Sequence, residues 1–94
     1  MRIADFQAHI RDRYFATDNA RGVGGTFLWF AEEFGELAEA LGDHERGKGD
    51  PKALAEEFAD CMAWMFTLAN ITGIDLEQAV RDKYLTDGGP KGTK

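Results

Sequence analysis

Apolar residues recur at three- and four-residue steps along two stretches of the chain, the spacing of one face of an α-helix. The stretch between them, residues 42–50, is polar and rich in glycine, which is typical of a short loop. Helices joined by a short loop pack as antiparallel neighbours. The pattern therefore predicts a central antiparallel helix hairpin, with the first stripe formed by Phe27, Phe30, Phe34, Leu37 and Leu41 and the second by Leu54, Phe58, Cys61, Met65 and Leu68.

A further helix is predicted before the hairpin. Apolar residues at helical spacing run from about Ile3 to Phe15, and the glycine-rich stretch 17–25 is then expected to form a loop. Thr26 is expected to cap the start of the next helix, and Gly42 is expected to end it.

The second half of the chain carries clearer boundary signals. Asp50 followed by Pro51 predicts a helix start, and Gly73 predicts its end. Asp75-x-x-Gln78 resembles a capping box that opens a short helix to about Tyr84. We expect one all-α domain of four helices over residues 1–94, with a flexible tail from about residue 87.

The third predicted helix bears on assembly. Between Cys61 and Ile71 it is apolar on nearly every side, so it must be covered on nearly every side. Three other helices of one small chain cannot easily do this. The economical solution is a homodimer in which two hairpins pack into a four-helix bundle.

Each hairpin helix also carries a pair of carboxylates three residues apart, beside its apolar stripe: Glu33 with Glu36, and Glu57 with Asp60. Residues three apart on a helix lie on neighbouring positions of its surface. In an antiparallel hairpin, residues at equal height have numbers with a constant sum, give or take a slip of a residue or two. A symmetric loop gives three facing pairs: Glu36 with Glu57, Glu33 with Asp60, and Trp29 with Trp64.

Four carboxylates at one place must be neutralised. Two unit charges roughly 5 Å apart repel by about 3 kcal/mol at an effective dielectric constant near 20. Either some carboxyls keep their protons or a cation binds among them. Oxygen ligands without His or Cys favour Mg²⁺ or Mn²⁺ over zinc, and Ca²⁺ usually takes more ligands from a loop. The sequence predicts a divalent-cation site formed by Glu33, Glu36, Glu57 and Asp60.

The motif Glu32-Glu33-x-x-Glu36, followed after a spacer by Glu57-x-x-Asp60, resembles that of the MazG-like nucleotide pyrophosphohydrolases. The flanking segments 21–22, 26–29 and 79–84 are similar as well. The resemblance implies an all-α enzyme that uses Mg²⁺ to hydrolyse a nucleoside triphosphate to the monophosphate and pyrophosphate. It also implies a homodimer or a dimer of dimers.

Further site residues are expected around this motif. Glu32 is a candidate to accept a proton from the attacking water. Trp29 and Trp64 lie on the carboxylate side of their helices and are candidates to stack on the nucleobase. The cationic candidates for binding the triphosphate are Arg21, Lys83, Lys91 and Lys94. Lys83 matches a lysine of the family's last motif, but many relatives continue with asparagine and arginine where this chain has Tyr84-Leu85.

Composition narrows the function classes. A net charge of −6 argues against nonspecific nucleic-acid binding, which depends on Lys and Arg at the phosphates. The single Cys61 excludes an internal disulfide and is expected to be a buried hydrophobe in a reducing compartment. There is no signal-like or membrane-spanning apolar run, so no membrane contact and a cytoplasmic location are expected.

Two other classes stay open. A di-iron carboxylate bundle of the ferritin-like kind would use a Glu-x-x-His pair, and no His lies three residues after a carboxylate of the quartet. A non-catalytic interaction module, whose cation only holds the bundle together, would carry the same acidic residues.

Overall fold

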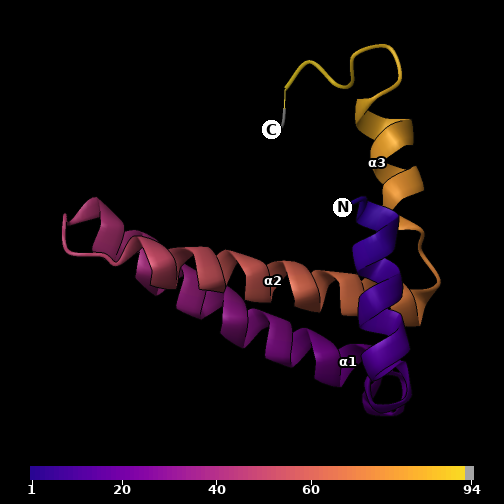
Figure 1. Cartoon of the computed structure of the whole chain (residues 1–94), viewed down its shortest axis with the longest axis horizontal. Coiled ribbons are helices and arrows are strands. Elements are labelled where there is room, and N and C mark those ends of the chain that lie inside the picture. The colour runs from indigo at the N-terminus through magenta and orange to yellow at the C-terminus, as the bar shows by residue number, and fades with distance from the viewer. Residues whose placement is uncertain (93–94) are drawn as a thin grey trace.

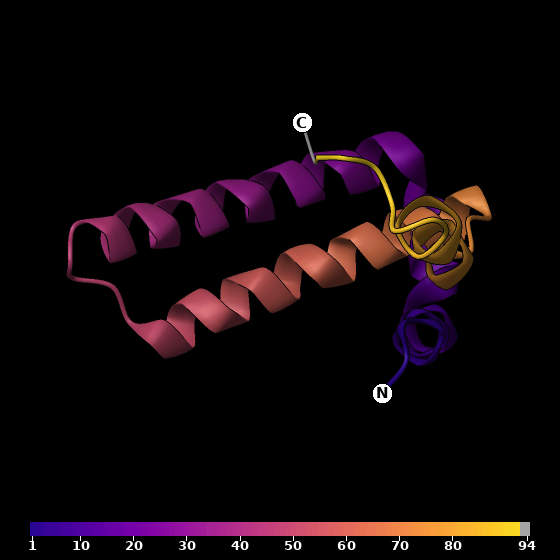
Figure 2. The same cartoon turned by 90° about the horizontal axis from the view of Figure 1, so that it is seen from above.

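The computed structural model describes residues 1–92, which fold into three helices and no strands. They are α1 (Ile3–Glu45), α2 (Pro51–Thr72) and α3 (Leu76–Tyr84). The second part of α1 lies alongside α2 as an antiparallel pair, joined to it by a short loop (Figures 1 and 2). The predicted all-α class is confirmed.

The first helix differs from the prediction, which placed a loop over residues 17–25. Within α1 only Gly22 has non-helical backbone angles, with φ 83° and ψ 177°. Among residue types, essentially only glycine adopts this conformation without strain. Two predicted helices are therefore two arms of one bent helix, which we name the N-terminal arm (residues 3–21) and the hairpin arm (residues 23–45). The loop over residues 17–25 and the N-cap role of Thr26 were wrong, because this stretch is helical except at Gly22. The count of four helices is not confirmed, because the two arms count together as α1.

The other helix boundaries are mostly as expected. The Asp50 carboxylate accepts a hydrogen bond from the Lys52 N–H at the start of α2, and Gly73 ends this helix in the left-handed conformation. The Asp75 carboxylate caps α3 by accepting from the Gln78 N–H. Gly42 does not end the hairpin arm, because the N–H of Arg46 still bonds to the Gly42 carbonyl and the helix continues to Glu45.

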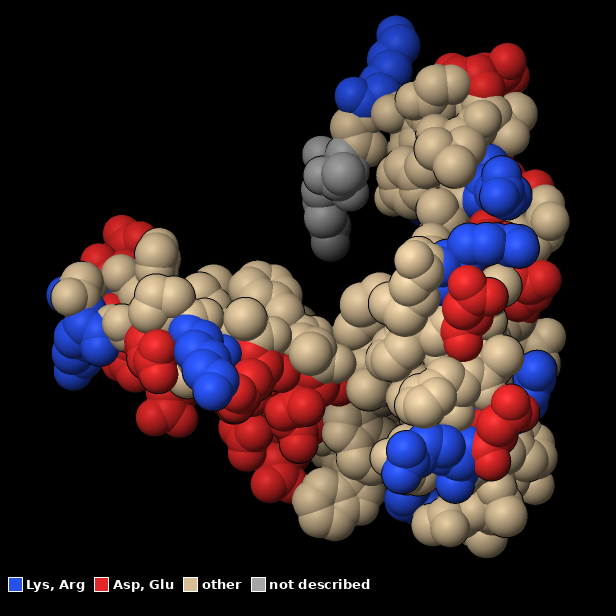
Figure 3. Space-filling model, viewed as in Figure 1, with Lys and Arg blue, Asp and Glu red and all other residues tan. Residues whose placement is uncertain are grey.

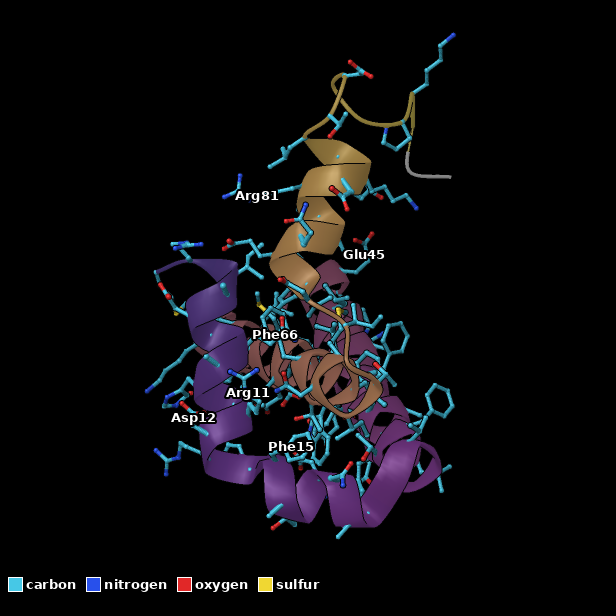
Figure 4. The ribbon with its side chains drawn as sticks, turned by 90° about the vertical axis from the view of Figure 1, so that its right-hand side faces the viewer. Arg11, Asp12, Phe15, Glu45, Phe66 and Arg81 are labelled. Carbon is cyan, nitrogen blue, oxygen red and sulfur yellow. The ribbon has the colours of Figure 1, made fainter. Side chains whose placement is uncertain are left out.

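The N-terminal arm crosses the end of α2, as Figure 1 shows, and the core lies between them. The rings of Phe6 and Phe66 have centroids 5.0 Å apart, and Ile10 and Ala69 are buried. Figure 4 shows Phe66 among the side chains between the two helices.

A polar bracket fixes α3 to this core. The buried Gln7 amide donates to the Ile74 carbonyl (2.6 Å) and accepts from the Leu76 N–H (2.9 Å). Arg2 pairs with Glu77 at 2.7 Å. These contacts hold α3 at the end of the hairpin opposite the loop (Figure 2).

The helices of residues 1–92 include none with a stretch both long and apolar enough to cross a membrane.

Candidate active site

Three carboxylates converge along the hairpin. Glu33 and Glu36 lie about one turn apart on the hairpin arm, and Glu57 approaches them from α2. One oxygen of each lies within 4.8 Å of the others. Figure 3 shows Asp and Glu side chains gathered over this part of the hairpin. The structure thus brings together three of the four ligands that the sequence predicts.

Asp60, the fourth predicted ligand, lies outside this close group. Its side chain is exposed, about one turn beyond Glu57 on α2. Its charge still contributes to the raised pKa of both Glu33 and Glu57. Asp60 therefore lies near enough to act electrostatically on the cluster.

The three-glutamate cluster is not neutralised by protein groups. Glu33 Oε2 and Glu57 Oε2 are buried and have no hydrogen-bond partner within residues 1–92. No ion pair in that part of the chain involves these carboxylates. Burying an anionic oxygen without a partner is costly, and a bound cation removes that cost. The all-oxygen donor set fits a hard divalent ion such as Mg²⁺ or Mn²⁺.

The pKa values of the cluster carboxyls reflect the same absence of neutralising groups. Burial, followed by the charge of Glu36, raises the pKa of Glu33 above its ordinary 4.5, and the same two causes raise the pKa of Glu57. Burial beside these carboxylates also raises the pKa of the Cys61 thiol above 9.0. The free thiol of Cys61 thus stays protonated near neutral pH, and its burial confirms the prediction of a small buried hydrophobe.

The two tryptophans confirm the register of the hairpin. The rings of Trp29 and Trp64 stack with centroids 6.4 Å apart and planes 13° from parallel. Trp29 lies about one turn before Glu33 on the hairpin arm, so the stack lies next to the three-glutamate cluster. The guanidinium carbon of Arg21 lies 4.9 Å from the centre of the Trp64 ring, in cation–π range.

Arg21 is held by a local network at the bend of α1. Its Nη2 donates to Asp18 Oδ1 at 2.6 Å, and its Nε donates to the hydroxyl of the fully buried Thr26 at 3.1 Å. A Cβ at Gly25 would lie 2.9 Å from Arg21 Cγ, so glycine leaves room for this side chain. The charge of Arg21 is therefore already paired with a buried carboxylate.

Asp18 was missed in the sequence because residues 17–25 were expected to form a loop. Its spacing of three residues from Arg21 becomes informative only once that stretch is known to be helical.

Lys83 is not brought to the acidic cluster within one chain. It lies on α3, where its ammonium group is 5.7 Å from the centre of the Tyr84 ring. The distance along α2 from Glu57 to its end at Thr72 is roughly 22 Å, and α3 follows that end. Glu32 is exposed next to Glu33, on the same arm as the cluster. Of the tail lysines, Lys91 is exposed beyond α3 and Lys94 lies outside the described residues.

Residues 24–84 match the family model of the MazG nucleotide pyrophosphohydrolase domain, more than half of the chain. The chain belongs to the MazG nucleotide pyrophosphohydrolase family. The matched region contains the acidic cluster and both tryptophans, and it starts after Asp18 and Arg21. Among curated proteins, none matches the chain.

Proposed function

We propose that the chain is an Mg²⁺-dependent nucleoside triphosphate pyrophosphohydrolase, which releases the nucleoside monophosphate and pyrophosphate. The observation that carries the proposal is the convergence of Glu33, Glu36 and Glu57 inside the family's domain, with two buried oxygens that have no hydrogen-bond partner within residues 1–92. A cluster of this kind suits a substrate whose phosphates arrive together with a divalent cation.

Glu33, Glu36 and Glu57 would hold the cation, with Asp60 as a fourth ligand. When bound, the cation neutralises the carboxylates, polarises phosphate oxygens and makes a bound water more acidic. In the proposed reaction, a water oxygen bonds to the α-phosphorus while the bond from that phosphorus to the bridging oxygen of the β-phosphate breaks. Glu32, exposed beside the cluster, is the candidate to accept the water's proton.

The other residues that were predicted to contact the substrate are the two tryptophans, Arg21 and Lys83. Trp64, seven residues beyond Glu57 on α2, would contact the base, and Trp29 stacks on its ring. Arg21 adjoins Trp64 and so lies on the base side of the site. Lys83 would reach the phosphates from the α3 of a second chain, since its own α3 lies at the far end of the hairpin.

The test is to measure pyrophosphate and orthophosphate release from a panel of nucleoside triphosphates, with and without Mg²⁺. We expect pyrophosphate from at least one substrate, only with Mg²⁺, and at least about 100-fold less from a Glu36→Gln plus Asp60→Asn variant. Glu39→Gln, at an exposed position of the same arm, is the matched control and should keep full activity. Release of orthophosphate alone, or full activity in the double variant, would contradict the proposal.

The same samples separate the two other classes. If the cation only held the bundle together, chelation would lower the melting temperature while no nucleotide changed it. A di-iron protein would contain iron as purified. The close group of carboxylates in residues 1–92 is made of glutamates alone.

We also propose that two hairpins pair into a four-helix bundle, which makes the protein a homodimer, with a dimer of dimers as the larger alternative. Much of the predicted apolar stripes stays uncovered in one chain, and Phe34 is 61% exposed. A face that exposes several large apolar side chains usually marks an interface. The exposed stripe residues are Phe27, Phe34 and Leu41 on the hairpin arm, and Phe58 and Met65 on α2. Met62 of α2 is exposed as well.

A Phe34→Glu plus Met65→Glu variant should sediment as a monomer, because it places charges in the proposed interface. A wild-type chain that sediments as a monomer at micromolar concentration would contradict the dimer. The cytoplasmic location stays a prediction.

A further inference from the structure

A cavity lies beside Trp64, between the N-terminal arm and α2, and has a volume of about 360 Å³. Its wall combines apolar and aromatic side chains, among them Ile10, Tyr14 and Trp64, with the Asp18–Arg21 ion pair. Small-molecule sites have this composition, a mostly apolar wall with a few placed polar groups, and volumes from about 300 Å³ upward.

Asp18 is the unusual member of this wall. Its side chain is 8% exposed, and while Oδ1 accepts from Arg21, the buried Oδ2 has no hydrogen-bond partner within the described residues. An acceptor left in this state destabilises the protein unless something donates to it. Asp18 lines the cavity, so a ligand bound there lies beside this carboxylate.

The charge of the site restricts what that donor is. The Asp18 carboxylate and the Arg21 guanidinium cancel, so the cavity carries no net charge from this pair. A cationic ligand would be repelled by the Arg21 guanidinium, and a phosphate would be repelled by the Asp18 carboxylate. A neutral, flat ligand with an N–H at its edge satisfies Oδ2 and contacts the Trp64 ring at the same time.

The position of the cavity relates it to the acidic cluster. Trp64 follows Glu57 by seven residues on α2, roughly 10 Å along the helix axis. In a nucleotide, the sugar separates the base from the phosphates, so the two sites must lie apart by a distance of this order. A triphosphate with its phosphates at the cluster can therefore place its base in the cavity.

We propose that this cavity binds the nucleobase, and that Asp18 Oδ2 selects bases with an exocyclic amino group. The inference rests on the proposed function and specifies its substrate class. A carbonyl oxygen at the same ring position would set two acceptors against each other, so uracil- and hypoxanthine-type bases are disfavoured.

Two matched pairs of substrates test the proposal, since CTP differs from UTP, and ATP from ITP, by amino against carbonyl at that ring edge. With Mg²⁺, we expect kcat/KM to favour the amino member of at least one pair by about 10-fold or more. Asp18→Asn presents a donor as well as an acceptor and should reduce that ratio to within about threefold. Equal use of both members by the wild type, or an unchanged ratio in Asp18→Asn, would overturn the proposal.

Asp12→Asn is the control, because Asp12 lies on the same arm, 76% exposed, on the outer side away from α2 (Figure 4). It should keep the wild-type ratio. If Asp18→Asn fails to fold, Ala63→Leu replaces it: the added side chain fills the cavity and should raise KM for the preferred triphosphate about 10-fold while kcat changes little. An unchanged KM in a folded Ala63→Leu protein would contradict a base in the cavity.

A second measurement separates this inference from the proposed function. Binding of CMP and UMP, and of AMP and IMP, is followed without Mg²⁺ through the fluorescence of the two tryptophans. Preferential binding of CMP or AMP that is lost in Asp18→Asn supports the cavity even if no triphosphate is hydrolysed. Hydrolysis of triphosphates without any such preference upholds the proposed function and overturns the role of Asp18.

Discussion

Glu57 and Glu77 are the same residue type in opposite circumstances. Glu57 has a buried oxygen without a hydrogen-bond partner among the described residues, and burial followed by the charge of Glu36 raises its pKa above 4.5. Glu77 accepts hydrogen bonds from Arg2 and from the Ala4 N–H, and chiefly the Arg2 bond lowers its pKa below 4.5. One region leaves its carboxylates uncompensated, and the other pairs its carboxylate completely.

The difference separates the proposed metal site along the hairpin from the contacts that hold α3 in place. We name the end of the molecule where α3 packs against α1 the closed end. Here α1 and α3 are joined by hydrogen bonds of Gln7, Arg2 and Glu77. Along the hairpin, Glu33, Glu36 and Glu57 form no ion pair within the part of the chain that the structure describes, so the fold does not need their charges. Protein groups that are arranged at a cost to stability are expected where a ligand completes them.

The largest expected effect is on activity. Glu57→Gln should lower kcat/KM for pyrophosphate release by at least about 100-fold, because it removes a predicted metal ligand. Glu77→Gln should leave kcat/KM within about threefold of the wild type, because Glu77 lies at the closed end. Similar losses in the two variants would erase the distinction between the regions.

The free energy of unfolding should depend on the closed end rather than on the glutamate cluster. Gln7→Ala removes two side-chain hydrogen bonds and leaves the Leu76 N–H and the Ile74 carbonyl without these partners. We expect a loss of about 2–3 kcal/mol in the free energy of unfolding, measured with urea, and unchanged Mg²⁺ affinity. Gln78→Ala, at an exposed site on α3, should stay within about 0.5 kcal/mol. A Gln7→Ala protein as stable as the wild type would show that the closed end does not depend on this bracket.

The bend of α1 connects the two regions. Gly22→Ala forces a side chain into φ 83° and should destabilise the protein by about 1–2 kcal/mol. Gly24→Ala, in the helical arm with open space around its Cβ, should stabilise it by up to about 1 kcal/mol. Equal changes in the two urea midpoints would contradict a fixed bend at Gly22.

The smallest effect is the pH dependence of stability, and its sign differs between the regions. A carboxyl with a raised pKa binds protons better in the folded state, so in chelator the cluster should lose stability as the pH rises from 4.5 through the raised pKa values of Glu33 and Glu57. Glu77 has a lowered pKa, so its contribution is present above 4.5 and is lost as the pH falls below it.

Melting temperatures across this pH range measure both effects. Glu57→Gln should flatten the loss at higher pH, and Glu77→Gln should flatten the loss at lower pH. Added Mg²⁺ should offset the loss at higher pH in the wild type, because it neutralises the cluster. A wild-type loss at higher pH that persists with Mg²⁺ would argue against a bound cation.

Much of the hairpin could be predicted because its signals are local. The apolar stripes, Asp50-Pro51 and Gly73 each act within a few residues. The constant-sum rule also placed Trp29 opposite Trp64, since a short loop leaves two helices little freedom of register. The three-glutamate part of the site followed from the same rule.

The bend and the base-side cavity could not be predicted in this way. Three glycines close together favour a loop by propensity, yet Gly24 and Gly25 are helical and only Gly22 departs from helical backbone angles. Asp18 lines a cavity that Ala63, Trp64 and Thr67 of α2 complete, and no local pattern encodes that packing. Exposure of Phe34 and its neighbours likewise depends on what a second chain would cover.

The most direct test of the account is a calorimetric titration of Mg²⁺ into the nucleotide-free protein, compared among the wild type, Glu33→Gln and Glu77→Gln. The account predicts that the wild type and Glu77→Gln bind the ion with equal affinity and that Glu33→Gln binds it at least about 10-fold more weakly. No binding to the wild type, or equal binding by all three proteins, would contradict the claim that these carboxylates stay uncompensated in order to hold a divalent cation.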